Sequence, residues 1–155
     1  MPADKPKEVE AADAKLALVC DDNVERQETL EDVLGDLGYS VQIAASPEDV
    51  YDKLKYNQYS VLYLHDNFGG GNSENNEILE YIQSMPISAR RRTFVALAGK
   101  NYTALNHMAA FAESVNIVIN EADMQEIKTI LKKSITGNNL FYKVYNDILH
   151  DFGKA

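Results

Sequence analysis

The stretch that decides the fold is Leu16-Ala17-Leu18-Val19-Cys20-Asp21-Asp22-Asn23. A short aliphatic run ends there in two adjacent carboxylates, and such a run suits a buried strand of a parallel sheet. In an open parallel sheet, ligands bind outside the carboxyl ends of the strands, where Asp21 and Asp22 are expected to lie. Two acids at that edge repel each other unless a cation, a basic side chain or solvent offsets their charge. The stretch leaves two roles open for them: an acidic pocket, or capping of the following helix.

The composition limits the classes of protein to which this chain can belong. Its 155 residues make one domain, 45% of them are hydrophobic, and the formal net charge is -9. This charge argues against nucleic acid as a direct partner, because phosphate binding needs clustered Lys and Arg. No apolar segment has the length of a membrane span, and no signal-peptide pattern opens the sequence. The single cysteine, Cys20, fits a reducing compartment, so we predict a cytoplasmic protein without a membrane partner.

Short apolar runs alternate with segments whose apolar residues recur at helical spacing. The runs, each expected to be a strand, lie at 16–20, 41–44, 60–64, 93–97 and 115–119. One helix start is explicit, because Ser46-Pro47-Glu48-Asp49 supplies an N-cap, a proline at the first helical position and acids in the first turn. Five alternations of strand and helix predict an α/β fold, a doubly wound five-stranded parallel sheet in a three-layer sandwich.

The sequence divides into three parts. Residues 1–14 have no apolar period and are predicted to be a disordered tail or linker, whereas 15–136 form the domain. At 137–155 we expect an additional C-terminal amphipathic helix, separated from the fifth helix by an interruption at Gly137-Asn138-Asn139. Its apolar stripe consists of Leu140, Phe141, Val144, Tyr145, Ile148, Leu149 and Phe152. Such a stripe must be buried on the domain itself or against a second copy, and we expect homodimerisation.

Three features together resemble a response-regulator receiver domain over 15–135: the pair Asp21-Asp22, the order of the five units, and the run Tyr59-Ser60-Val61-Leu62-Tyr63-Leu64. Receiver domains are the phosphoacceptor modules of bacterial two-component signalling and have a flavodoxin-like fold. The resemblance implies that two acids hold Mg²⁺ and that an Asp at the end of the third strand accepts the phosphoryl group. It also implies a Ser or Thr after the fourth strand and a Lys after the fifth, both of which contact that group.

Only the acid pair of this set is intact. Counted without gaps, the phosphoacceptor position falls on His65, with Asp66 one residue later as the alternative. The hydroxyl position falls on Ala98, and the lysine position falls on Asn120, which is followed by Glu121. A phosphoryl group would therefore lack both its hydroxyl partner and the cation that neutralises its charge. We predict a degenerate pseudo-receiver.

The same residues leave more than one interpretation of the pocket. Asp21, Asp22 and Asp66 offer a weak Mg²⁺ site, which is the alternative to our expectation of no cofactor. His65 is either a further metal ligand or, as we favour, the partner of one of the first two acids. The basic cluster Arg90-Arg91-Arg92 is expected to be a solvated loop.

These observations predict a protein-interaction module of signal transduction, not an enzyme, that acts without phosphorylation on a signalling protein of unknown identity. The first alternative is a functional phosphoacceptor that uses Asp66 with Mg²⁺. A further alternative is a flavodoxin-like cofactor-binding protein, because the same sheet order can hold a cofactor at this edge. A visible absorbance spectrum tests that last alternative.

Overall fold

The strands of this protein form a single parallel sheet. The computed structural model describes residues 15–71, 76–102 and 106–154, so the expected tail at 1–14 lies outside the described residues. The strands are β1 (Lys15–Cys20), β2 (Tyr39–Ile43), β3 (Val61–His65), β4 (Phe94–Gly99) and β5 (Ile117–Asn120). They are arranged in the order β2-β1-β3-β4-β5, and every neighbouring pair is parallel. The predicted flavodoxin-like, doubly wound five-stranded sheet is confirmed.

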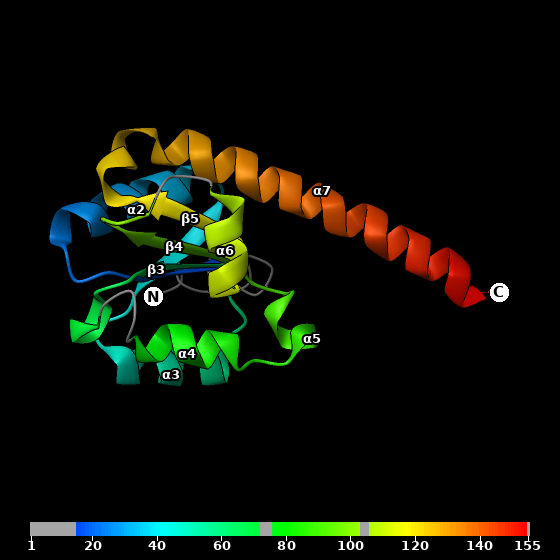
Figure 1. Ribbon diagram of the computed structural model, residues 1–155, viewed down its shortest axis with the longest axis horizontal. Coiled ribbons are helices and arrows are strands. Elements are labelled where there is room, and N and C mark those ends of the chain that lie inside the picture. Colours follow the sequence, from blue (N-terminus) through cyan, green and yellow to red (C-terminus); the bar gives the residue numbers. More distant parts are fainter. Residues whose placement is uncertain (1–14, 72–75, 103–105, 155) are drawn as a thin grey trace, which may run out of the picture.

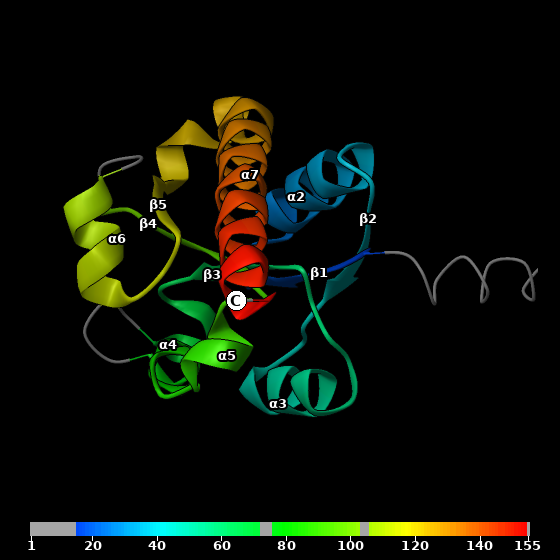
Figure 2. The same ribbon diagram turned by 90° about the vertical axis from the view of Figure 1, so that its right-hand side faces the viewer.

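Helices cover both faces of the sheet (Figures 1 and 2). The helices are α2 (Val24–Asp36), α3 (Pro47–Tyr56), α4 (Glu77–Gln83), α5 (Ile87–Arg90), α6 (His107–Glu113) and α7 (Ile127–Lys154), with 3-10 turns η1 (Phe68–Gly70) and η2 (Glu121–Glu126). The helices α2 and α7 pack on one face, and α3, α4 and α6 pack on the other. This is the predicted three-layer sandwich.

The strand β1 shows why the apolar run that precedes the acid pair is continuous. Ala17 and Val19 face α2 and α7, whereas Leu18 and Cys20 face the opposite helical layer. All four side chains are fully buried, because successive residues of a strand point to opposite faces and both faces are covered. The run ends where the strand leaves the two helical layers, so the next residue, Asp21, lies at the carboxyl edge of the sheet.

Local signals in the sequence set the helix ends as expected. The Ser46 hydroxyl accepts a hydrogen bond from the Asp49 N–H at 3.2 Å, and the Asp49 carboxylate accepts one from the Ala45 N–H at 2.8 Å. The first bond satisfies a backbone donor that the first helical turn leaves unpaired, and the second pairs the N–H of the residue before the N-cap. At the end of α2 the chain reverses through Gly38, whose φ of 100° is a conformation that glycine adopts without strain.

The extra C-terminal helix is present, but it is the second half of α7 and not a separate element. The interruption expected at Gly137-Asn138-Asn139 does not occur, because α7 continues through it from Ile127 to Lys154. One glycine costs a helix only about 1 kcal/mol relative to alanine. The buried side chains of Leu131 and Ile135 hold the helix on the sheet just before this point. Within the described part of the chain, no helix, α7 included, is long and apolar enough to cross a membrane.

The second half of α7 continues past the edge of the sheet and projects from the domain (Figure 1). Leu140, Val144 and Ile148 are 62%, 49% and 48% exposed. The side chains of the other predicted stripe residues lie outside the described residues; these are Phe141, Tyr145, Leu149 and Phe152.

Candidate functional site

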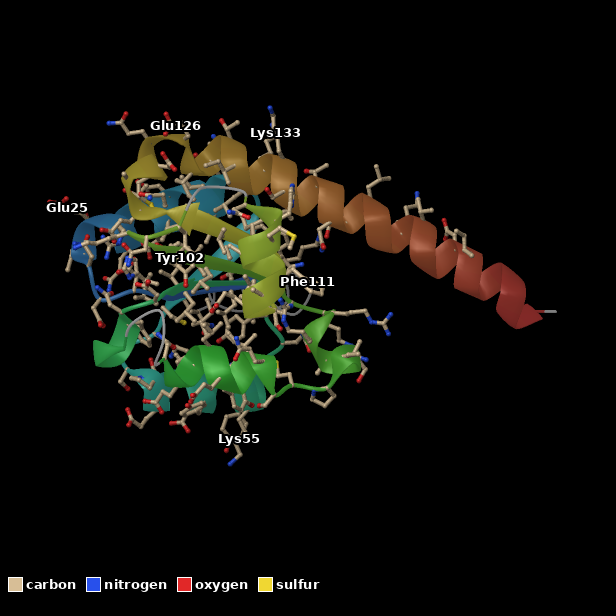
Figure 3. All side chains as sticks on the ribbon, viewed as in Figure 1. Glu25, Lys55, Tyr102, Phe111, Glu126 and Lys133 are labelled. Carbon is tan, nitrogen blue, oxygen red and sulfur yellow. The ribbon has the colours of Figure 1, made fainter. Side chains whose placement is uncertain are left out.

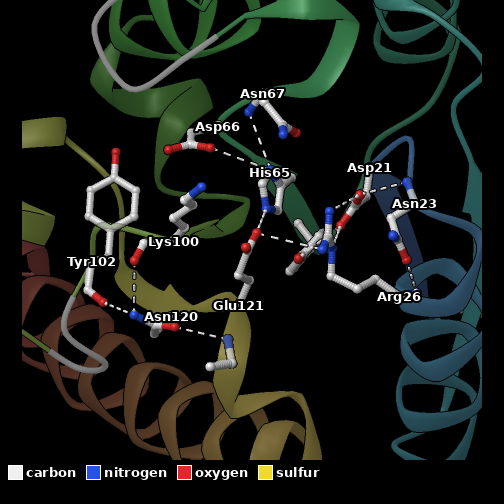
Figure 4. Close-up of polar contacts among 12 residues, drawn as sticks. Asp21, Asn23, Arg26, His65, Asp66, Asn67, Lys100, Tyr102, Asn120 and Glu121 are labelled. Carbon is white, nitrogen blue, oxygen red and sulfur yellow. Dashed lines mark hydrogen bonds and ion pairs between the residues drawn. The ribbon is translucent and has the colours of Figure 1, made fainter.

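The candidate functional residues gather at the carboxyl edge of the sheet (Figure 4). Asp21 follows the last residue of β1, His65 is the last residue of β3, and Asn120 is the last residue of β5. The sheet order places β1 and β4 on either side of β3, so these strand ends are close together. This is the crevice position at which open parallel sheets bind ligands.

Asp21 is fully buried, and its carboxylate is bound by a side chain that we did not single out in the sequence. Arg26 donates from Nε to Oδ2 at 2.7 Å and from Nη2 to Oδ1 at 3.0 Å. The same carboxylate accepts hydrogen bonds from the Asn23 N–H at 2.9 Å and from the Tyr63 hydroxyl at 3.1 Å. Burial and the neighbouring Asp21 raise the pKa of Tyr63 well above its ordinary value, so the phenol stays protonated and donates. A guanidinium bound through two parallel hydrogen bonds is a strong partner for a buried carboxylate.

The position of Arg26 follows from the start of α2. Asn23 caps this helix, because its side-chain oxygen accepts the Arg26 N–H at 2.9 Å. Arg26 thus lies in the first helical turn, where a cation is unfavourable because the helix dipole is positive there. Asp21 offsets this cost. A basic residue in the first turn after two acids is a signal that a cation lies near them, although the spacing alone does not say which acid it binds.

His65 pairs with Glu121 and not with either acid of the β1 edge. The His65 Nε2 lies 2.6 Å from the Glu121 Oε2, and the His65 side chain is only 1% exposed. The His65 Nδ1 lies 3.3 Å from the Asn67 N–H and 3.4 Å from the Asp66 Oδ1. Arg26 lies 3.5 Å from the same Glu121 oxygen through Nη1. The pairing we favoured, His65 with Asp21 or Asp22, is therefore replaced by a pair with the acid after β5.

The two other acids of the predicted pocket point to different neighbours. Asp22 is exposed, and its Oδ2 accepts the Gly69 N–H of the loop after β3 at 2.9 Å. Asp66 is only 7% exposed, and burial raises the pKa of its carboxyl. A Cβ at Gly99 would collide with the Asp66 carboxylate and the Tyr102 ring, so the glycine makes room for this acid.

The register of the strands separates His65 from Asp66. His65 lies opposite Ala98 of β4. Asp66 lies one position further along the chain, and its N–H donates to the Ala98 carbonyl. The next residue of β4, Gly99, lies opposite Asn120. His65 is therefore level with the predicted hydroxyl position, and Asp66 is level with the predicted lysine position.

The two positions that carry the phosphoryl contacts in receiver domains have structural roles here. Ala98 is fully buried and has no hydroxyl. The Asn120 amide donates to the carbonyls of Lys100 and Tyr102, at 3.2 and 2.7 Å. Its oxygen accepts the Ala122 N–H at 2.9 Å and so begins η2. Asn120 therefore fixes the loop after β4, and its short side chain brings no positive charge to the site.

The edge fits a guanidinium better than a hydrated Mg²⁺. Mg²⁺ binds oxygen ligands in a near-octahedral shell with several waters. Both oxygens of Asp21 are bonded to Arg26, and Asp22 is bonded to the Gly69 N–H. Among residues 15–71, 76–102 and 106–154, no three His, Cys, Asp or Glu side chains form a group that could hold a metal ion.

Comparison with solved structures shows that the fold is that of response-regulator receiver domains. The chain is similar to a CheY-like receiver domain from Methylobacillus flagellatus, with a TM-score of 0.58, 16% identity and coverage of 78% of this chain and 98% of that one. A CheY-like receiver domain protein from Methanospirillum hungatei JF-1 gives a TM-score of 0.62 at 15% identity, covering 81% and 97%. The chemotaxis response regulator CheY4 of Vibrio cholerae gives 0.57 at 15% identity, covering 78% and 98%. No protein-family model matches the sequence, and no curated protein sequence matches it.

Proposed function

We propose that this chain is a receiver-like module of signal transduction that binds a signalling partner without being phosphorylated and catalyses no reaction. The observation that carries the proposal is the two-bond pair of Arg26 with the buried Asp21. In this pair a fixed side chain supplies the positive charge that Mg²⁺ supplies in a phosphorylatable receiver domain. The proposal places the module in the cytoplasm, where the single buried thiol of Cys20 stays reduced.

The missing contacts of a phosphoryl group support the same conclusion. Ala98 offers no hydroxyl, and Asn120 offers no cation, so added negative charge would have no partner at either position. A receiver switches because these two contacts form only after phosphorylation and move the surface. Here the pairs of Asp21 with Arg26 and of His65 with Glu121 hold the edge in one arrangement without a ligand.

The test is incubation of the full chain with acetyl phosphate and Mg²⁺, followed by intact mass measurement. We expect no adduct. The variant Ala98→Thr/Asn120→Lys restores the two missing groups. A phosphorylatable receiver domain, treated in the same way, is the positive control that shows that acetyl phosphate is active. An increase in the mass of the unmodified chain by one phosphoryl group, absent from Asp66→Asn, contradicts the proposal.

A second candidate function keeps Asp66 as a phosphoacceptor that uses Mg²⁺. The observation in its favour is the strand register, which places Asp66 level with Asn120 at the edge of the sheet. Against it, the Asp66 side chain is nearly buried beside Gly99, and the Asp21 carboxylate is already paired. The mass measurement on Asp66→Asn separates the two candidates.

For the partner, the proposal includes homodimerisation through the projecting half of α7. Leu140, Val144 and Ile148 are spaced by four residues, so they share one side of the helix, and all three are exposed. An unpaired apolar face of this kind is typical of a helix that packs against a second copy. Sedimentation equilibrium should show a dimer for the full chain and a monomer for Val144→Asp/Ile148→Asp. Monomers for both proteins contradict the dimer, and Lys133→Gln on the same helix is the control.

A further inference from the structure

The second half of α7 carries two opposite charges beside its exposed apolar residues. Leu140, Val144 and Ile148 are spaced by four residues and share one side of the helix. Lys143 and Asp147 are also exposed, and each directly precedes one of these apolar residues. Because successive residues of an α-helix are turned by about 100°, both charges lie on the same flank of the apolar row. We name these five residues the α7 ridge.

The domain does not cover the α7 ridge. Leu131 and Ile135 hold the first half of α7 on the sheet, whereas the second half continues past its edge (Figures 1 and 2). The ridge is therefore accessible to a second molecule over about two helical turns. An apolar row flanked by charges is typical of a helix that packs lengthwise against another helix.

The two ways of pairing this helix with a copy of itself bring different flanks together. In a parallel pair, the flank that carries Lys143 and Asp147 meets the opposite flank of the second copy. The positions on that opposite flank are 141, 145 and 149, and none of them is charged in the sequence. A parallel pair would therefore desolvate both charges without giving them partners of opposite charge. In an antiparallel pair, each flank meets the same flank of the second copy, so charges face charges.

We propose that the α7 ridge pairs with the α7 ridge of a second copy in antiparallel orientation. This inference rests on the homodimer of the proposed function and adds the contact surface and its orientation. In such a pair Val144 lies opposite the same residue of the second copy, and Leu140 lies opposite Ile148. On the charged flank, Lys143 of each copy faces Asp147 of the other, so two-fold symmetry gives two contacts per dimer. The two domains, whose chains each have a net charge of -9, then lie at opposite ends of the helical pair.

The test is sedimentation equilibrium of the full chain and of charge-reversed variants at low ionic strength. Lys143→Glu and Asp147→Lys each replace two attractive contacts by two repulsive ones. We expect each to raise the dissociation constant of the dimer about tenfold. The double variant Lys143→Glu/Asp147→Lys should regain the dissociation constant of the unmodified chain, because both contacts again join opposite charges. An effect of net charge alone would instead make Asp147→Lys dimerise more tightly, since that variant has a smaller negative charge.

The matched control is Lys133→Glu/Asp147→Lys, which has the same net charge as the double reversal. Lys133 lies on the half of α7 that covers the sheet, outside the α7 ridge (Figure 3). This control should remain about tenfold weaker than the unmodified chain, because its two repulsive contacts persist. The three substituted side chains are exposed, so the fold is retained, and an unchanged melting temperature verifies this.

Cross-linking gives the orientation independently. In the antiparallel pair, residue 140 lies about 12 Å along the helix axis from residue 140 of the second copy and level with residue 148. Oxidation with diamide should therefore cross-link a mixture of Leu140→Cys and Ile148→Cys, and neither variant alone. The native Cys20 is buried and does not interfere.

Two results overturn the antiparallel pair and leave the homodimer standing. They are cross-linking of each cysteine variant alone, and a double reversal that dimerises as weakly as the Lys133→Glu/Asp147→Lys control. A monomeric unmodified chain overturns both the orientation and the homodimer. The absence of phosphorylation is decided separately, by the mass measurement with acetyl phosphate.

Discussion

Arg26 binds Asp21 through two parallel hydrogen bonds, Nε to Oδ2 at 2.7 Å and Nη2 to Oδ1 at 3.0 Å. The carboxylate is fully buried, whereas 19% of the arginine side chain is exposed. The cation of this site therefore comes from the chain itself and reaches outward to solvent. It also lies within 3.5 Å of Glu121, so one side chain connects the edge of β1 with the segment that follows β5.

Replacement of this cation should destabilise the fold. We expect Arg26→Gln to lower the free energy of unfolding by about 2 kcal/mol, because it leaves a buried carboxylate without its charged partner. Urea denaturation followed by circular dichroism measures the change. In the double variant Asp21→Asn/Arg26→Gln, the loss should be smaller than the sum of the two single losses. Additive losses would show that the two residues do not interact.

The pair of His65 with Glu121 gives a second prediction. Glu121→Ala leaves the buried imidazole N–H without an acceptor, which should cost about 1 to 2 kcal/mol. The same unfolding measurement applies. Glu126→Ala is the matched control, because Glu126 belongs to the same 3-10 segment and is exposed. Equal stability of the two variants would show that the pair contributes nothing.

Several parts of this structure were predictable from short stretches of sequence. The alternation of strands and helices, the cap at Ser46 and the turn at Gly38 depend on residues that are neighbours in the chain. The uninterrupted course of α7 was not predictable in this way. The cost of Gly137 is local, but the packing of Leu131 and Ile135 that outweighs it depends on the sheet.

The candidate site was predictable in its location but not in its pairs. The acids after β1 and the residues after β3 were expected at one edge, and they lie there. The partner of Asp21 lies five residues away in a helix whose orientation is fixed by tertiary packing, and Glu121 contacts His65 from η2, which follows β5. Local spacing cannot distinguish these pairs from the pairing of His65 with Asp22 that the sequence also allowed.

The thiol of Cys20 should be unreactive in the folded protein. The side chain is fully buried in β1, and burial raises the pKa of the thiol, so very little thiolate is present at neutral pH. Ellman's reagent should label no thiol in native buffer and one thiol per chain in guanidinium chloride. Complete labelling of the native protein within the dead time of mixing would show that β1 opens readily.

The carboxylate of Asp49 should stabilise the start of α3 at neutral pH. Its bond from the Ala45 N–H, together with Lys53, lowers the pKa of this group. The contribution is therefore present above the unfolded pKa of about 3.9 and is lost as the pH falls through the lower folded value. We expect Asp49→Asn to cost about 0.5 kcal/mol at pH 7 and nothing at the acidic end. Denaturation curves of the two proteins over this range test it, and a constant difference would exclude an electrostatic origin.

Asp66 should show the opposite dependence on pH. Burial raises the pKa of its carboxyl, so the folded state retains a proton over the interval from about 3.9 up to the raised value, where the unfolded state has lost it. The contribution of Asp66 to the free energy of unfolding therefore falls as the pH rises across that interval.

The variant Asp66→Asn tests this dependence, because it removes the charge and keeps the shape of the side chain. It should be as stable as the unmodified chain at the acidic end and more stable, by about 0.5 to 1 kcal/mol, at pH 7. The measurement is the difference in urea midpoint between the two proteins at each pH, with Asp22→Asn as the control, because Asp22 is exposed. A variant that is less stable than the unmodified chain at pH 7 would mean that the charged Asp66 is stabilised at this edge, where its Oδ1 lies 3.4 Å from the His65 Nδ1.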